Sequence, residues 1–167
     1  MGSRLGFRNK KAFIGDVLLL LIFMFIMALT ILCAYLVLSN VNTAFQASSS
    51  IADAGKTIVS NSTSSYTSLW DGLFVFLLVG LSLASWISAY FIDTHPIMFV
   101  FMLMILAAYI FVGASIANAY WNVEAASAFS GFALNFKMMH YIMAHLPYYV
   151  MIEGAGLLLA LFAKVNS

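Results

Sequence analysis

Long apolar runs separated by short polar stretches dominate the hydrophobic pattern of the chain. Two of these runs lie between Leu69 and Ala119, and each is about 22 residues long, enough at 1.5 Å per residue to cross a hydrocarbon core of about 30 Å. The polar turn Asp93-Thr94-His95-Pro96 joins them, and proline is favoured in the first turn of a helix. Because this joint is so short, we expect the two spans to be antiparallel neighbours.

Two further apolar runs flank this pair. Residues 17–38 follow a basic tail, exceed the ~7–15-residue apolar core of a signal peptide and lack a clear cleavage site, so we interpret them as a retained first span. The last run extends from about His140 to Ala163 and contains Pro147, which should bend it near its start because proline removes an amide donor. The pattern therefore predicts about four transmembrane helices.

The polar stretch at residues 39–68 is rich in Ser, Thr and Asn and contains no proline. We expect a solvated loop here, although such a stretch can also continue as helix. Asn61-Ser62-Thr63 within it matches the acceptor triplet for N-glycosylation. At its end, Ser68 and Asp71 have the spacing of a capping box that opens the second span.

A second connector, residues 122–139, is neither polar enough for a free loop nor long enough for a span. Large apolar side chains from this connector and from the start of the last run fall on one helical stripe: Phe129, Phe132, Phe136, Met139 and Met143. This spacing predicts an interfacial amphipathic helix that lies in the membrane surface and leads into the last span. A re-entrant or loop segment is the alternative.

The composition indicates that the bilayer is the solvent for most of the chain. Of its 167 residues, 64% are hydrophobic and 8% are charged, whereas a soluble domain carries about 25% charged residues. We therefore expect an all-α, polytopic membrane protein with a single membrane domain. Its parts are a basic N-terminal tail (1–16), the first span (17–38), a Ser/Thr-rich loop (39–68), and a unit of helical hairpin, interfacial helix and last span (69–164).

Charge and cysteine content exclude several other classes of protein. The formal net charge is only +1, so we expect no broad basic surface and no specific nucleic-acid binding. Cys33 is the only cysteine, which excludes an intrachain disulfide and a cysteine metal cluster.

The distribution of basic residues predicts the topology, because lysine and arginine favour the cytoplasmic side of a membrane. With four spans, the two termini share a side. That side then carries five of the basic residues, namely Arg4, Arg8, Lys10, Lys11 and Lys164, and the other side carries Lys56 and Lys137. We expect both termini in the cytoplasm, with the basic tail facing a partner.

Small residues recur every four positions in three of the spans and predict close packing of helices. They are Gly80, Ala84 and Ser88 in the second span, Gly113 and Ala117 in the third, and Gly156 and Ala160 in the last. We expect the stripe of the second span to pack against the third span or against a second copy of the chain. A substrate groove is the alternative.

Glu153 is the one ionisable side chain that the pattern puts deep within a span, where a charge costs about 2.5–3.5 kcal/mol even on lenient scales. Three roles stay open. The carboxyl group can be protonated and hydrogen-bonded to a neighbour such as Tyr109 or Ser82, it can line a wet path together with His145, or it can make a contact between subunits.

The sequence does not predict catalysis. His140 and His145 are five residues apart, which puts them on different helix faces, and no acidic or cysteine partner lies nearby, so we expect no metal site. We find no catalytic triad, phosphate-binding loop or pair of catalytic carboxylates, and therefore expect neither an enzyme nor a cofactor.

Three stretches within residues 69–164 form a recognisable pattern: Phe91-Ile92-Asp93-Thr94-His95-Pro96, then Ala117-Asn118-Ala119-Tyr120, then His145-Leu146-Pro147-Tyr148 with Gly154 and Gly156. With this pattern, residues 69–164 resemble small integral membrane proteins of tailless, membrane-containing icosahedral bacteriophages. The resemblance implies a virion component in the vesicle beneath the capsid, which scaffolds the membrane, anchors capsid or vertex proteins or helps to deliver the genome.

The expected partners are the lipid bilayer, other membrane or capsid proteins, and further copies of the chain. Two other functions compete with the structural one. The first is a channel, holin or small transporter subunit that uses Glu153, and the second is an accessory subunit of a cellular membrane complex.

Overall fold

The structure is a computed structural model that describes the backbone of residues 12–91 and 96–165, with side chains over 17–91 and 100–163. In this part of the chain it contains helices and no strands: α1 (Ala12–Ala47), α2 (Asp53–Tyr90), α3 (Pro96–Ala125), a 3₁₀ turn η1 (Ala133–Asn135), α4 (Lys137–Ala144) and α5 (Leu146–Val165). Four segments are long and apolar enough to cross a membrane: Val17–Ala47, Asp53–Tyr90, Val100–Ala125 and Leu146–Ala163. The prediction of an all-α, polytopic membrane protein is confirmed.

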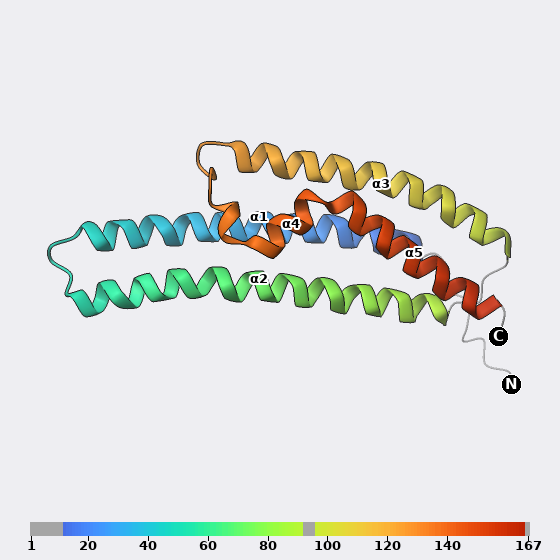
Figure 1. Cartoon of the computed structure of the whole chain (residues 1–167), viewed down its shortest axis with the longest axis horizontal. Coiled ribbons are helices and arrows are strands. Elements are labelled where there is room, and N and C mark those ends of the chain that lie inside the picture. The colour runs from blue at the N-terminus through green and yellow to red at the C-terminus, as the bar shows by residue number, and fades with distance from the viewer. Residues whose placement is uncertain (1–11, 92–95, 166–167) are drawn as a thin grey trace, which may run out of the picture.

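The helices α1 and α2 form a long antiparallel hairpin, and α3 runs along the opposite side of the bundle (Figure 1). The last helix, α5, packs on both α2 and α3. We expected α2 and α3 to be packed neighbours, and this prediction is wrong: they run antiparallel, but α5 lies between them. The short joint fixes only where α2 ends and α3 begins, which leaves room for a helix to enter between them.

Glycines on α5 explain how this helix fits between two others. A Cβ atom at Gly154 would overlap the Leu106 side chain of α3, and one at Gly156 would overlap the Trp86 indole of α2. On the α3 side, a Cβ at Gly113 would lie 3.1 Å from Val150 Cγ2. These glycines bring the helix axes close together, which is how small residues stabilise helix pairs in lipid.

The Ser/Thr-rich segment is not a loop. Helix α1 continues to Ala47 and α2 already begins at Asp53, so most of residues 39–68 is helical. The segment contains no proline, and only the turn at residues 48–52 interrupts the helices. Threonine hydroxyls donate to carbonyls of their own helix, as Thr43 does to Ser39 O at 3.0 Å and Thr57 to Asp53 O at 2.9 Å. The proposed capping box is also wrong, because Ser68 and Asp71 lie inside α2.

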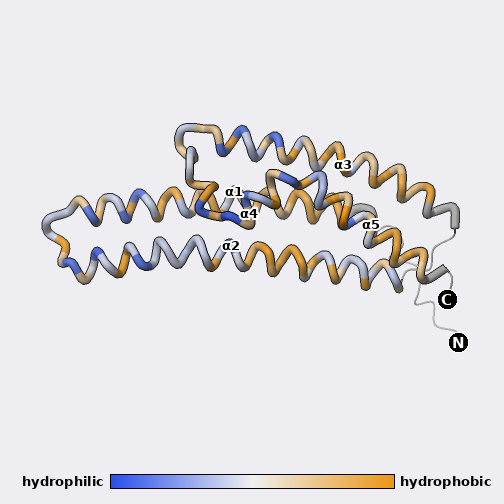
Figure 2. Tube along the Cα trace, viewed as in Figure 1, coloured by the Kyte–Doolittle hydropathy of each residue, from blue (hydrophilic) through white to orange (hydrophobic). Residues whose placement is uncertain are grey.

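The α1–α2 hairpin is therefore longer than a bilayer is thick. The two helices contain 36 and 38 residues, while about 20 suffice to cross the hydrocarbon core. Figure 2 shows that apolar residues dominate one half of the hairpin and polar residues the half that holds the α1–α2 turn. At 1.5 Å per residue, residues 53–68 carry α2 about 24 Å beyond its apolar part.

The connector at residues 122–139 is not a single amphipathic helix on the membrane surface. Helix α3 continues to Ala125, turns and η1 follow, and α4 begins at Lys137. Phe136, Met139 and Met143 from the predicted stripe are fully buried, in a core shared with α1 and α2. The stripe faces inward because the α1–α2 hairpin offers it an apolar surface within the protein.

Both prolines lie at helix starts, where the sequence predicted a helix start at Pro96 and a bend at Pro147. Helix α3 begins at Pro96, whose missing amide has no partner to lose at that position. Helix α4 ends at Ala144 and α5 begins at Leu146, so the last predicted span is divided into two helices just before Pro147 and not merely bent.

Candidate functional site

The candidate site is a group of polar side chains buried between α2 and α5. Glu153 lies at its centre and is only 1% exposed. Neither carboxyl oxygen of Glu153 has a hydrogen-bond partner. Within the described part of the chain, no salt bridge reaches this carboxyl group either. The structure thus buries an acidic group without compensating its charge.

Helix α2 supplies the neighbours of Glu153. Ser82 and Ser85, with Trp86, lie beside the carboxyl group. The indole Nε1 of Trp86 donates to the backbone carbonyl of Glu153 at 3.2 Å, and the ring covers Gly156. This hydrogen bond and the ring contact hold α5 against α2 at the position of the acid.

A pair of hydroxyls completes the cluster. Ser82 Oγ donates to Leu78 O at 2.9 Å and is also hydrogen-bonded to the hydroxyl of Tyr149, one turn before Glu153 on α5. Because Ser82 has only one hydroxyl proton, Tyr149 is the donor in the second bond. The two hydroxyls therefore use their protons on other oxygens and keep lone pairs that can accept.

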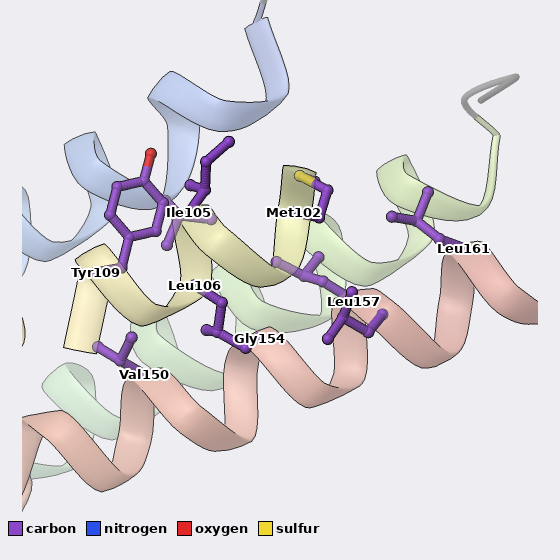
Figure 3. A pocket seen from close by; sticks show the side chains of 10 residues that line it. Met102, Ile105, Leu106, Tyr109, Val150, Gly154, Leu157 and Leu161 are labelled. Atoms are coloured by element: carbon purple, nitrogen blue, oxygen red, sulfur yellow. The ribbon is translucent and has the colours of Figure 1, made fainter. Parts of the chain in front are cut away.

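An apolar cavity lies next to the cluster, on the side of α1 and α3. It is lined by residues such as Met102, Leu106 and Val150, which surround Gly154 (Figure 3). Its volume is about 30 Å³, more than the ~10–15 Å³ that one water molecule needs. Glu153 is not among its lining residues, so this cavity does not connect the acid to an aqueous path.

His145 does not join Glu153. It lies at the break between α4 and α5, is exposed, stacks on Tyr141 with 4.4 Å between ring centroids, and has its Nδ1 2.9 Å from Tyr141 O. The sequence suggested that both residues line one wet path. His145 lies at the start of α5 and is exposed, whereas Glu153 is buried, so the structure does not bring the two side chains together.

Of the two hydrogen-bond neighbours proposed for Glu153, Ser82 is in the cluster. Tyr109 packs against apolar residues of α5 such as Leu157 and Val150. Sequence reasoning missed Tyr149, Ser85 and Trp86. The four-residue spacing of Tyr149 and Glu153 was a usable signal, since it puts both on one face of a helix.

A second polar cluster joins α2, α3 and α4. The carboxylate of Asp71 accepts from the backbone amides of Met138 at 3.0 Å and Met139 at 2.7 Å, which caps the first turn of α4. Glu124 Oε2 of α3 lies 3.3 Å from His140 Nδ1 of α4. Among the described side chains, no group of three or more potential metal ligands occurs here or elsewhere.

The predicted packing residues fall into two sets. Gly113 and Ala117 are buried between α3 and α5, Gly156 packs against Trp86, and Ala160 is half-buried. The stripe of the second span faces outward: Gly80, Ala84 and Ser88 are all exposed. Its predicted packing against the third span is wrong because α5, not α3, covers α2, and it does so on the face of Ser82 and Trp86.

Some of the predicted features lie outside the part of the chain that the structure describes. These are the basic tail residues Arg4, Arg8, Lys10 and Lys11 and the turn residues Asp93, Thr94 and His95. For Lys164 the structure describes the backbone but not the side chain. Their roles stay predictions.

Comparisons of the chain with protein-family models, with curated proteins and with solved structures gave no match.

Proposed function

We propose that this chain is a non-enzymatic structural protein of a membrane, and that this membrane is the internal vesicle of a virion. The assignment to a membrane rests on the four apolar helices. The structural role is supported by hydrogen bonds that polar side chains of the apolar helices make to other helices. Asp71, Trp86 and Tyr149 each bind another helix, which fixes the relative positions of the helices.

The setting in a virion rests on the resemblance to membrane proteins of icosahedral phages. A vesicle that buds inward from the host's cytoplasmic membrane keeps its cytoplasmic face outward, toward the capsid. With cytoplasmic termini, the tail with Arg4, Arg8, Lys10 and Lys11 then faces capsid or vertex proteins. The polar half of the α1–α2 hairpin faces the interior of the vesicle.

Protection of purified particles tests this orientation. A label that cannot cross membranes should reach the N-terminus of intact vesicles whose capsid has been removed. Cysteine introduced by Ser60→Cys, on the exposed face of the hairpin, should react only after vesicle rupture, in a chain that also carries Cys33→Ala. Reaction of the N-terminus only after rupture would contradict the proposal, and so would the absence of the chain from the particles.

The charge of the tail gives a second test. Replacement of its four basic residues by glutamine should abolish recruitment of the partner capsid protein to membranes that contain the chain. The matched control is Lys56→Gln with Lys137→Gln, which removes charge from the opposite side. Equal loss in both variants would count against a specific role of the tail.

A channel or holin role is the second candidate, and buried Glu153 is the observation that favours it. Ion flux through proteoliposomes distinguishes the two functions. A scaffold leaves the vesicles tight, whereas a leak that Glu153→Gln abolishes would establish the channel. Stoichiometric co-purification with a larger cellular complex would instead support an accessory subunit.

A further inference from the structure

The burial of Glu153 has a consequence beyond the scaffold role. An acidic side chain that is 1% exposed within a span, with both oxygens unpartnered, is unfavourable as an anion because neither water nor a counter-charge solvates it. Such a group is stable in the folded protein only if something neutralises it.

No described side chain around Glu153 carries a positive charge. Helix α2 contributes Ser82, Ser85 and Trp86, and α5 itself contributes Tyr149. The faces of α1 and α3 that pack on α5 contribute apolar groups and a tyrosine: Val17, Leu21, Leu106 and Tyr109. His145, the histidine at the start of α5, is exposed and engaged with Tyr141.

Hydrogen-bond accounting favours a proton over a metal cation as the neutralising group. Ser82 donates to Leu78 O and Tyr149 donates to Ser82, so neither of these two hydroxyls has a proton left for the carboxylate. Ser85 is the remaining hydroxyl beside it, and one neutral donor does not compensate a buried charge. A protonated carboxyl group becomes a donor and can use the lone pair that Tyr149 or Ser82 keeps. A cation would need several oxygens free to turn toward it, and these two already hold other partners.

We propose that the Glu153 carboxyl group is a proton-binding site and that the bound proton keeps α5 packed on α2. The link to packing is direct, since Trp86 binds the backbone carbonyl of Glu153 and covers Gly156 in the same contact. Loss of the proton at rising pH leaves a buried anion, which draws water into the contact and separates Trp86 from α5. The contact between α5 and α2 is therefore closed while the carboxyl group holds its proton and opens when the proton is lost.

Infrared spectroscopy tests the protonation directly. The chain contains only two glutamates, Glu124 and Glu153, so Glu124→Gln leaves Glu153 as the only one. This variant, labelled with ¹³C-glutamate and reconstituted in lipid nanodiscs, should show the C=O band of a protonated carboxyl group at neutral pH. A spectrum with only the ionised carboxylate bands would overturn the proposal. If Glu124→Gln fails to fold, the labelled wild-type chain serves, since two ionised glutamates would again show no protonated band.

A second variant separates a hydrogen-bonded proton from a merely buried one. Tyr149→Phe removes a hydroxyl from the cluster and should shift the C=O band of Glu153. Tyr148→Phe, at an exposed position next to it, should leave the band unchanged. Equal behaviour of the two variants would contradict the proposed hydrogen bond.

Trp86 reports whether the proton holds the helices together. In a chain with Trp70→Phe and Trp121→Phe, Trp86 is the only tryptophan. Its emission should shift to longer wavelength over the pH range in which the C=O band disappears, and Glu153→Gln should abolish this shift. Emission that stays constant while the band disappears would show that the bound proton does not hold α5 on α2.

Discussion

The two halves of the α1–α2 hairpin use the same types of polar side chain in opposite ways. In the polar half, Thr43 and Thr57 donate to carbonyls of their own helix, one turn back. In the apolar half, Ser82 also does so but in addition binds Tyr149 of α5, and Trp86 binds Glu153. Water can satisfy a hydroxyl outside the membrane, whereas in lipid the remaining partners must come from another helix.

The glycines show the same contrast. Gly156 lies under the Trp86 indole, while Gly80 on the outer face of α2 has open space where a Cβ would be. A small residue thus contributes to packing only where a second helix lies against it. A four-residue spacing by itself does not show where such a contact lies.

The largest effect is expected from a side chain added at the α2–α5 contact. Gly156→Leu forces the Trp86 indole out of its position and should lower the free energy of unfolding by about 1–3 kcal/mol. Gly80→Leu is the matched control, with an expected change within about 0.5 kcal/mol. Unfolding of both variants in detergent micelles measures this. If the two variants were equally damaged, the outer face of α2 would be an interface, as with a second copy of the chain.

Removal of the cross-helix cap should have the next largest effect. Asp71→Ala leaves the first amides of α4 without an acceptor and should cost about 1 kcal/mol. Asp53→Ala, in the first turn of α2 and exposed, should cost less because only its interaction with the helix dipole is lost, about 0.3–1 kcal/mol. Amide exchange of Met138 and Met139 should accelerate only in Asp71→Ala. Unchanged exchange there would show that the carboxylate does not cap α4.

The hydroxyl pair within the bundle should contribute a smaller amount. A double-mutant cycle with Ser82→Ala and Tyr149→Phe should give a coupling energy of about 0.6 kcal/mol, the typical size for hydrogen bonds between membrane helices. A cycle that combines Thr57→Ala with Tyr149→Phe should give about zero, because these residues are too far apart to interact. Equal coupling in both cycles would remove the distinction between the two halves of the hairpin.

The features of the fold that could be predicted from the sequence are those that depend on local chemistry. Apolar runs reveal spans because each must cover a fixed thickness of lipid. Pro96 and Pro147 mark helix boundaries because of their missing amides.

The predictions that were wrong concern contacts between residues that are distant in sequence. Asp71 has the spacing of a local cap but caps α4, 67 residues later in the chain. From the sequence, the small-residue stripe on α2 was as good a candidate for helix packing as Gly156. Only the position of α5 in the fold shows which of them contacts another helix. Of the candidate site, Glu153 and Ser82 could be proposed from polarity within apolar runs. Tyr149 could have been added from its four-residue spacing to Glu153. Trp86 could not, because tryptophan is common at membrane interfaces and signals no particular contact.

The central claim is that α5 lies between α2 and α3 and contacts α2 at Trp86. Solid-state NMR of the chain in lipid bilayers tests it directly, through cross-peaks that report contacts between residues. We expect a cross-peak between the Trp86 indole and Gly156, and no contact from Gly80 to Gly113 or Ala117. Cross-peaks from Gly80 to these α3 residues, without the one between Trp86 and Gly156, would contradict it.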